Sequence, residues 1–154
     1  RDEMLDVLAI TNLYPPHSLG GYEGACRDVV QRFRERGHRV EVLTSTWRRP
    51  EVEADAFDEM GVHRDLRLTS TFVPLRPPPL RWSDERANAR VLRERLAEAQ
   101  PDVLSIWNMA GLSLGLLTEL QQSGVPIVYV VCDDWLVGCA ERDPWLAPFR
   151  SRPK

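Results

Sequence analysis

The chain has 154 residues, of which 43% are hydrophobic, and its formal net charge is −3. This length suits one ordinary domain with a sizeable core. The slight acidic excess leaves no basic footprint of the kind that nucleic-acid-binding domains carry, so we expect no nucleic-acid partner. Arginines are frequent between residues 27 and 49. This cluster is either a solvated helix face and loop, or a patch that attracts anionic substrates or lipid head groups at a membrane surface.

Three cysteines, Cys26, Cys132 and Cys139, fit neither a zinc pattern nor a CxxC redox pattern. An odd number of cysteines without such spacing indicates free thiols in a reducing compartment. No apolar run approaches the length of a membrane span, and the N-terminus lacks the apolar region of a signal peptide. The sequence therefore predicts a soluble, cytoplasmic protein.

The first predicted elements form a βαβ unit. Residues 5–12 are a short apolar run, typical of a strand buried on both faces. A loop rich in Pro and Gly follows over residues 13–21, and helical periodicity extends from about residue 24 to residue 36. Gly37 is placed to end this helix, and residues 40–45 form the second strand.

Residues 46–82 are the least regular part, with a third strand expected within residues 61–68. The triple proline at 77–79 predicts an extended linker, and Ser83 is the expected N-cap of a helix that ends before Pro101. A strand at 102–108, a helix at 112–123 and a strand at 127–132 follow, the chain turns polar and aromatic beyond Asp133, and residues 143–154 show no finished element. This alternation predicts a doubly wound α/β fold with a mainly parallel sheet sandwiched by helices.

Ligands of such sheets bind at the carboxyl ends of the strands, near a topological switch point. The loop after the first strand carries Gly20 and Gly21, which can adopt positive φ and let the backbone approach a ligand. The helix behind them presents free N–H groups to a phosphate or a developing anion. A plain tight turn is the alternative, because the spacing matches neither the dinucleotide fingerprint nor a P-loop.

Two further corners follow predicted strands. Asn108 either offers its amide to a sugar hydroxyl or phosphate, or caps the next helix. In the corner Cys132-Asp133-Asp134-Trp135, the two carboxylates can supply a general base or accept bonds from hydroxyls, and Trp135 can pack against a sugar ring. The alternative for this corner is a helix cap with Trp135 in the core.

Two stretches resemble the family 4 (group 1) retaining glycosyltransferases of GT-B fold. ITNLYPPHSLGGYEGACRDVVQRFRERGHRVEVLTS, at residues 10–45, is similar to the opening of that family: a Pro-containing loop, Gly-Gly-x-Glu, an amphipathic helix and Arg-Gly-His before a Val-rich strand. PDVLSIWNMAGLSLGLLTELQQSGVPIVYVVCDDWL, at residues 101–136, is similar to a later block, in which a strand ends in a His-Asp-x-Trp-like motif. Cys132 replaces that His, which in the family helps to hold the transferred sugar.

The resemblance implies a Rossmann-like acceptor-side domain over residues 1–136, with residues 137–154 leading to a donor-binding domain that the chain lacks. It implies that Gly20 and Gly21 line the interdomain cleft, with Asn108 and Asp133 on its floor. We assign Asp133 as the catalytic residue; Gly20, Gly21, Asn108, Cys132, Asp134 and Trp135 as substrate-binding residues; and no metal or other cofactor.

The expected function is retaining transfer of a sugar from a nucleotide-sugar donor, bound mainly by the other domain, to a glycan, lipid-linked or small-molecule acceptor. By itself the chain is expected to be inactive. The alternative is a non-catalytic Rossmann-like module for binding or interaction, which Cys132 in the His position favours.

Overall fold

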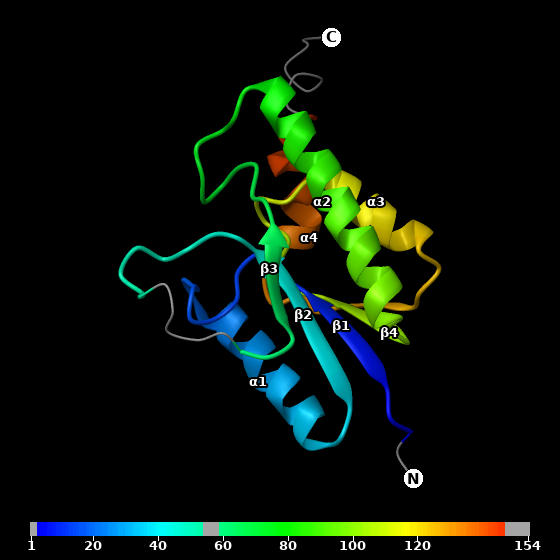
Figure 1. Cartoon of the computed structure of the whole chain (residues 1–154). Coiled ribbons are helices and arrows are strands. Elements are labelled where there is room, and N and C mark those ends of the chain that lie inside the picture. The colour runs from blue at the N-terminus through cyan, green and yellow to red at the C-terminus, as the bar shows by residue number, and fades with distance from the viewer. Residues whose placement is uncertain (1–2, 54–58, 147–154) are drawn as a thin grey trace.

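The computed structural model describes residues 3–53 and 59–146, over which strands and helices alternate (Figure 1). The elements are β1 (Asp6–Ile10), α1 (Gly21–Glu35), β2 (Arg39–Ser45), β3 (Val62–Leu66), α2 (Pro78–Ala99), β4 (Val103–Ile106), α3 (Leu114–Gln122), β5 (Ile127–Tyr129) and α4 (Trp135–Arg142). The predicted doubly wound α/β fold is confirmed.

The strands form one parallel sheet in the order β3-β2-β1-β4-β5. The order reverses between β1 and β4, so the switch point lies between the carboxyl ends of these two strands. In Figure 1 this edge of the sheet faces upward, and the loops that follow β1, β2 and β3 gather there.

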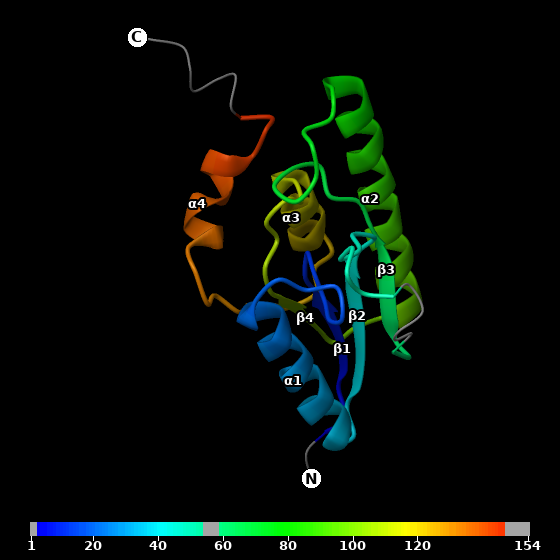
Figure 2. The ribbon, with the colours of Figure 1, turned by 90° about the vertical axis from the view of Figure 1, so that its left-hand side faces the viewer.

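Two cores explain why the strands are apolar on both faces. Leu8 and Ile10 of β1 belong to a core that α2 and α3 cover, whereas Val7 and Ala9 pack with α1 on the other face. Successive side chains of a strand point to opposite faces, so a strand covered on both sides needs a continuous apolar run. Figure 2 shows α1 and α2 on opposite sides of the sheet.

The prediction for the start of α2 was wrong. The helix begins at Pro78 with Pro77 as its N-cap, so Pro78 and Pro79 lie in its first turn and Ser83 lies inside it. Proline is excluded only from positions whose N–H must bond to the preceding turn, and the first turn has no such partner. The triple proline therefore begins the helix instead of forming a linker before it.

Helix α4 was predicted only as the alternative for the corner after β5, in which an aspartate caps a helix and Trp135 lies in the core. It spans the expected boundary between residues 136 and 137, and the chain stays attached to the domain beyond it. The Asp143 carboxylate accepts a hydrogen bond from Leu114 N at the start of α3, and the Trp145 indole N–H donates to the Glu85 carboxylate of α2. Residues 147–154 lie outside the described residues. Among the described helices, none combines the length and hydropathy that a bilayer crossing requires.

Candidate functional site

Two asparagines join the carboxyl ends of β1 and β4 at the switch point. Asn12 N donates to Asn108 O at 2.6 Å, and Asn12 Nδ2 donates to Ala110 O at 2.9 Å. Asn108 Oδ1 accepts a bond from Ala110 N at 2.9 Å. Both residues are buried, Asn12 fully and Asn108 to 9% exposure. Asn108 therefore orders its own loop, and its Nδ2 has no partner among the described residues.

The N-terminus of α1 opens onto the same edge of the sheet. Gly20 and Gly21 are both exposed, and Glu23 caps the helix by accepting a bond from Gly20 N at 2.9 Å. The expected positive φ is wrong, because Gly20 has φ −153° and Gly21 begins the helix. A Cβ at Gly21 would meet no atom within 4 Å. The two glycines thus leave open space beside the free N–H groups of the first turn.

Tyr22 ties the start of α1 to the end of β5. Its hydroxyl accepts bonds from Cys132 N at 3.1 Å and from Trp135 Nε1 at 3.0 Å, and donates to Val130 O. Burial raises the pKa of this phenol, which keeps its proton available for the bond to Val130. The start of α1, which carries the paired glycines, therefore lies beside the Cys-Asp-Asp corner.

The corner after β5 divides into buried and exposed parts. Asp133 precedes the N-cap residue Asp134, and its Oδ1 accepts a bond at 2.8 Å from the N–H of Trp135, the first residue of α4. Asp134 is exposed and pairs with Arg142 through Oδ1 at 3.0 Å. Cys132 is exposed too, whereas Trp135 is 2% exposed and belongs to the core. The expectation that Trp135 offers its ring to a sugar is wrong in this structure, because neighbouring side chains cover that ring.

The model of the family described as Glycosyltransferase Family 4 matches residues 19–153, which is most of the chain. The chain belongs to glycosyltransferase family 4. No curated protein matches it. Membership of this family supports a transferase, which in general acts on a sugar donor and an acceptor. The match includes the paired glycines, the loop after β4 with Asn108, and the corner after β5, whereas Asn12 precedes it.

In this glycosyltransferase family 4 domain, His17 is a structural residue of the loop before the glycines. It is 2% exposed, and its Nδ1 accepts a bond from Arg49 N at 3.2 Å. Burial lowers the pKa of His17, and the charges of Arg48 and Arg64 lower it further. A neutral ring whose Nδ1 is already bonded holds the loops after β1 and β2 together.

The enclosed space next to the switch point is too small for a sugar. A cavity of about 30 Å³ lies among residues that include Met109, Gly111, Trp135 and Asp143. That volume suits about one water molecule, whereas small-molecule pockets span roughly 300–1,000 Å³. A sugar therefore does not fit inside this cavity beside the switch point.

Sequence reasoning missed three residues that hold the rim together: Asn12, Tyr22 and Asp143. Asn12 falls within an apolar run that was assigned wholly to a strand, and an amide at a strand end was the available signal. Tyr22 lies between the glycines and the amphipathic stretch, and Asp143 caps a helix that precedes it by 29 residues. Neither contact has a local pattern that could have predicted it.

Proposed function

We propose that this family 4 domain forms the acceptor side of a cleft in which a sugar moves from a nucleotide-sugar donor to an acceptor with retention of configuration. The observation that supports this most directly is the Tyr22 hydroxyl, which bonds to Val130, Cys132 and Trp135 and so holds the start of α1 against the corner after β5. A helix N-terminus and a carboxylate corner thereby meet beside the switch point of the sheet.

The start of α1 is suited to a departing phosphate. In retaining transfer from a nucleotide sugar, the bond between the anomeric carbon and the phosphate oxygen breaks, and negative charge develops on the diphosphate. The N–H groups at a helix N-terminus and the helix dipole stabilise such a charge without moving. Gly20 and Gly21 leave the approach to these groups open. The Glu23 carboxylate is 5% exposed and bonded to Gly20 N, so it caps the helix from the inner side.

The acceptor is placed by polar groups of the other two loops. Asp133 uses Oδ1 to accept the N–H of Trp135, and its second oxygen, which has no partner among the described residues, is free to accept a proton or a bond from an acceptor hydroxyl. Asn108 Nδ2 can donate to a sugar oxygen from the floor of the cleft. Asp134 and the peptide at Cys132 complete the rim that faces the sugar.

A second domain would bind the nucleotide and close this cleft, as the GT-B resemblance implies. Because α4 and Trp145 contact the present domain, we place the connection to such a domain beyond Trp145 instead of at residue 137. The acceptor-side unit would then extend from the N-terminal residues through α4.

The test is a screen of the full-length protein against a panel of nucleotide sugars. Donor hydrolysis and transfer would be followed by release of the nucleoside diphosphate, and the anomeric configuration of the product by NMR. We expect turnover with one nucleotide sugar and a product with the donor's configuration. Inversion would refute retention, and no turnover with any donor would favour the non-catalytic alternative.

Gly21→Val tests the role of the α1 N-terminus. A side chain at Gly21 meets nothing within 4 Å, so the variant should fold while it blocks the approach to the first-turn N–H groups. We expect kcat to fall by about tenfold or more, because loss of one oxyanion donor costs roughly 10²–10³-fold in kcat and the valine side chain hinders access to the donors without removing them. Gly24→Val on the same helix, which also meets nothing within 4 Å, is the matched control. Equal kinetics in the two variants would exclude the glycines from the mechanism.

A further inference from the structure

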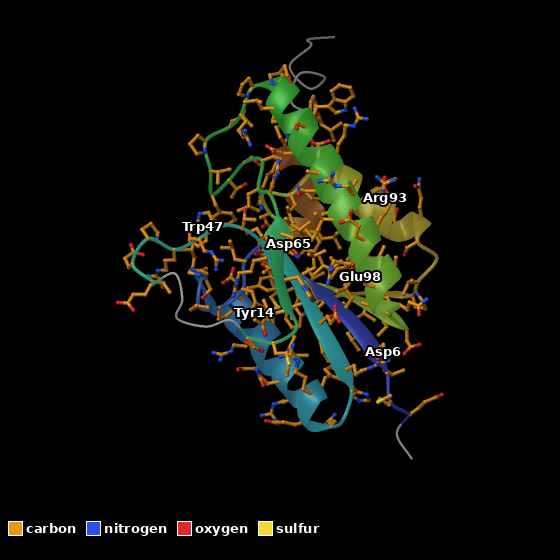
Figure 3. All side chains as sticks on the ribbon, viewed as in Figure 1. Asp6, Tyr14, Trp47, Asp65, Arg93 and Glu98 are labelled. Atoms are coloured by element: carbon orange, nitrogen blue, oxygen red, sulfur yellow. The ribbon has the colours of Figure 1, made fainter. Side chains whose placement is uncertain are left out.

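A second cavity on the carboxyl edge lies away from the glycines, at the ends of β2 and β3. It has a volume of about 470 Å³, within the range of small-molecule pockets. Thr46 and Trp47, which follow β2, form one side, and Arg67, Leu68, Pro74 and Arg76 form the other. Figure 3 labels Trp47 just beyond the upper end of β2, beside the loop that rises from β3 to α2.

The two arginines of this cavity share one buried carboxylate. Asp84 of α2 is almost fully buried, and accepts bonds from Arg67 Nη1 at 3.1 Å and from Arg76 Nη1 at 2.6 Å. Two positive charges therefore meet one negative charge, which leaves an excess of one positive charge at the cavity. About half of each arginine side chain is exposed. Each guanidinium also keeps Nε and Nη2 without a partner among the described residues.

A second buried side chain fixes the backbone of Arg67. Asn88 of α2 is 3% exposed; its Oδ1 accepts a bond from Arg67 N at 2.7 Å and its Nδ2 donates to Arg67 O at 2.8 Å. Asp84 and Asn88 thus hold the backbone and the side chain of Arg67 in one orientation. Arginines that are fixed before binding lose little entropy when they form a two-pronged bond with an oxyanion.

The rest of the cavity wall is apolar and aromatic. Trp47 is half-buried, with its ring 6.3 Å from that of Phe72, and Leu68, Val73 and Pro74 supply aliphatic surface. A flat aromatic ring beside aliphatic side chains packs against the C–H face of a sugar or polyol ring, while paired guanidinium groups bind phosphate. A neighbouring cavity along α2 also combines arginines with a tryptophan, but there the Arg86 guanidinium already stacks on the Trp82 ring.

We propose that this cavity binds a phosphorylated sugar or polyol, with the phosphate on Arg67 and Arg76 and the ring on Trp47. The end of β2 is connected to the switch point, because Ser45 N donates a hydrogen bond to Asn12 O at 3.2 Å. If the proposed function holds, this ligand is the acceptor of the transferred sugar, so that assignment rests on the proposed function. The phosphate can belong to a soluble sugar phosphate or to a lipid headgroup, and both present the same group to the arginines.

Binding to the full-length protein tests the cavity without requiring turnover. Ligand-observed NMR would compare glucose 6-phosphate with glucose and with inorganic phosphate, and cosedimentation would compare phosphatidylglycerol vesicles with phosphatidylcholine vesicles. We expect a phosphorylated probe to bind about tenfold more tightly than its unphosphorylated counterpart. Preference for glucose 6-phosphate identifies a soluble ligand, and preference for phosphatidylglycerol vesicles identifies a lipid headgroup.

Substitution of the two arginines tests whether the preference for a phosphorylated probe arises from this cavity. Arg76→Gln and Arg67→Gln should each weaken binding of the phosphorylated probe about five- to tenfold and leave glucose binding unchanged. Arg76→Gln is the safer variant, because Arg67 remains to pair with Asp84. Arg36→Gln, an exposed position at the C-terminal end of α1, makes the same change of charge away from the cavity and should have no effect.

The outcomes separate this inference from the proposed function. Phosphate binding that depends on Arg67 and Arg76 supports the cavity even where no nucleotide sugar is turned over. Turnover of a nucleotide sugar without such binding supports the transferase and overturns the cavity. Equal losses in the Arg76 and Arg36 variants, or no preference for any phosphorylated probe, also overturn it.

Discussion

The Tyr22 hydroxyl makes the contact on which the shape of the rim depends, and Tyr22→Phe removes only that hydroxyl. The substitution takes away the acceptor of Trp135 Nε1 and Cys132 N and the donor to Val130 O. The ring itself still packs against Trp107, whose centroid is 6.1 Å away. Any effect therefore comes from the lost hydrogen bonds and not from a cavity.

The expected loss of stability depends on which hydrogen-bond partners of Tyr22 can bond to water once the hydroxyl is removed. Trp135 is 2% exposed, so its indole N–H stays unpaired, and Val130 is only partly exposed. A buried polar group left without a partner costs about 1–3 kcal/mol. Cys132 is exposed, and its N–H can bond to water at little cost. We expect a loss of about 2–4 kcal/mol in the free energy of unfolding, which corresponds to a decrease in Tm of roughly 5–15 °C.

Tyr129→Phe is the matched control, because the hydroxyl of Tyr129 on β5 makes no hydrogen bond to any described residue. Its expected effect is within about 0.5 kcal/mol. Urea unfolding followed by circular dichroism would measure both variants, and the reactivity of the Cys132 thiol toward a thiol reagent would report whether the corner moves. Equal unfolding midpoints for the two phenylalanine variants would refute the role given to Tyr22.

Four further substitutions, one of them a control, test other parts of the fold by the same unfolding measurement. Tyr14→Phe should stabilise the protein by about 1 kcal/mol, since the Tyr14 hydroxyl is buried without a partner among the described residues; a loss of stability would show that a partner exists. Gly111→Ala should cost about 2–4 kcal/mol, because φ is +84° and a Cβ would lie 2.8 Å from a backbone oxygen. Gly37→Ala, at φ +88° with open space, should cost only about 1 kcal/mol, and equal costs would exclude the clash. Asp143→Ala should cost about 1–2 kcal/mol by uncapping Leu114 at the start of α3; a neutral effect would mean that α4 is not attached there.

The regular part of the fold could be predicted because its signals are local. A strand such as β1, covered on both faces, must be apolar throughout, and Gly37 and Gly124 end helices with positive φ of 88° and 73°. These features depend on the residue itself and its near neighbours. The order of strands and helices, and with it the parallel sheet, followed from them.

The sequence-based predictions failed where a local propensity rule has an exception, or where a residue's environment is set by residues far away along the chain. Pro78 and Pro79 begin α2, although proline elsewhere argues against a helix. Asp133 and Trp135 carry a capping signal, but a helix that contains Gly138 and only eight residues gives weak periodicity. The buried state of Trp135 depends on Tyr22, which is 113 residues away along the chain. No pattern within the corner itself distinguishes a core tryptophan from one that contacts a ligand.

Most polar side chains at the carboxyl edge already form structural hydrogen bonds, and this limits the chemistry that the domain can supply. Asn12, Asn108 and Asp133 each use at least one polar atom to hold a loop, and His17 is bonded through Nδ1. The groups that remain accessible to a ligand are chiefly positive. They are the N–H groups at the start of α1 and, farther along the edge, Arg67 and Arg76, which pair with Asp84. Groups of this kind bind phosphates and stabilise a leaving group that gains negative charge. In the proposed transferase, the second carboxylate oxygen of Asp133 would serve as the base on one side of an acceptor hydroxyl, and the departing phosphate at the start of α1 would lie on its other side.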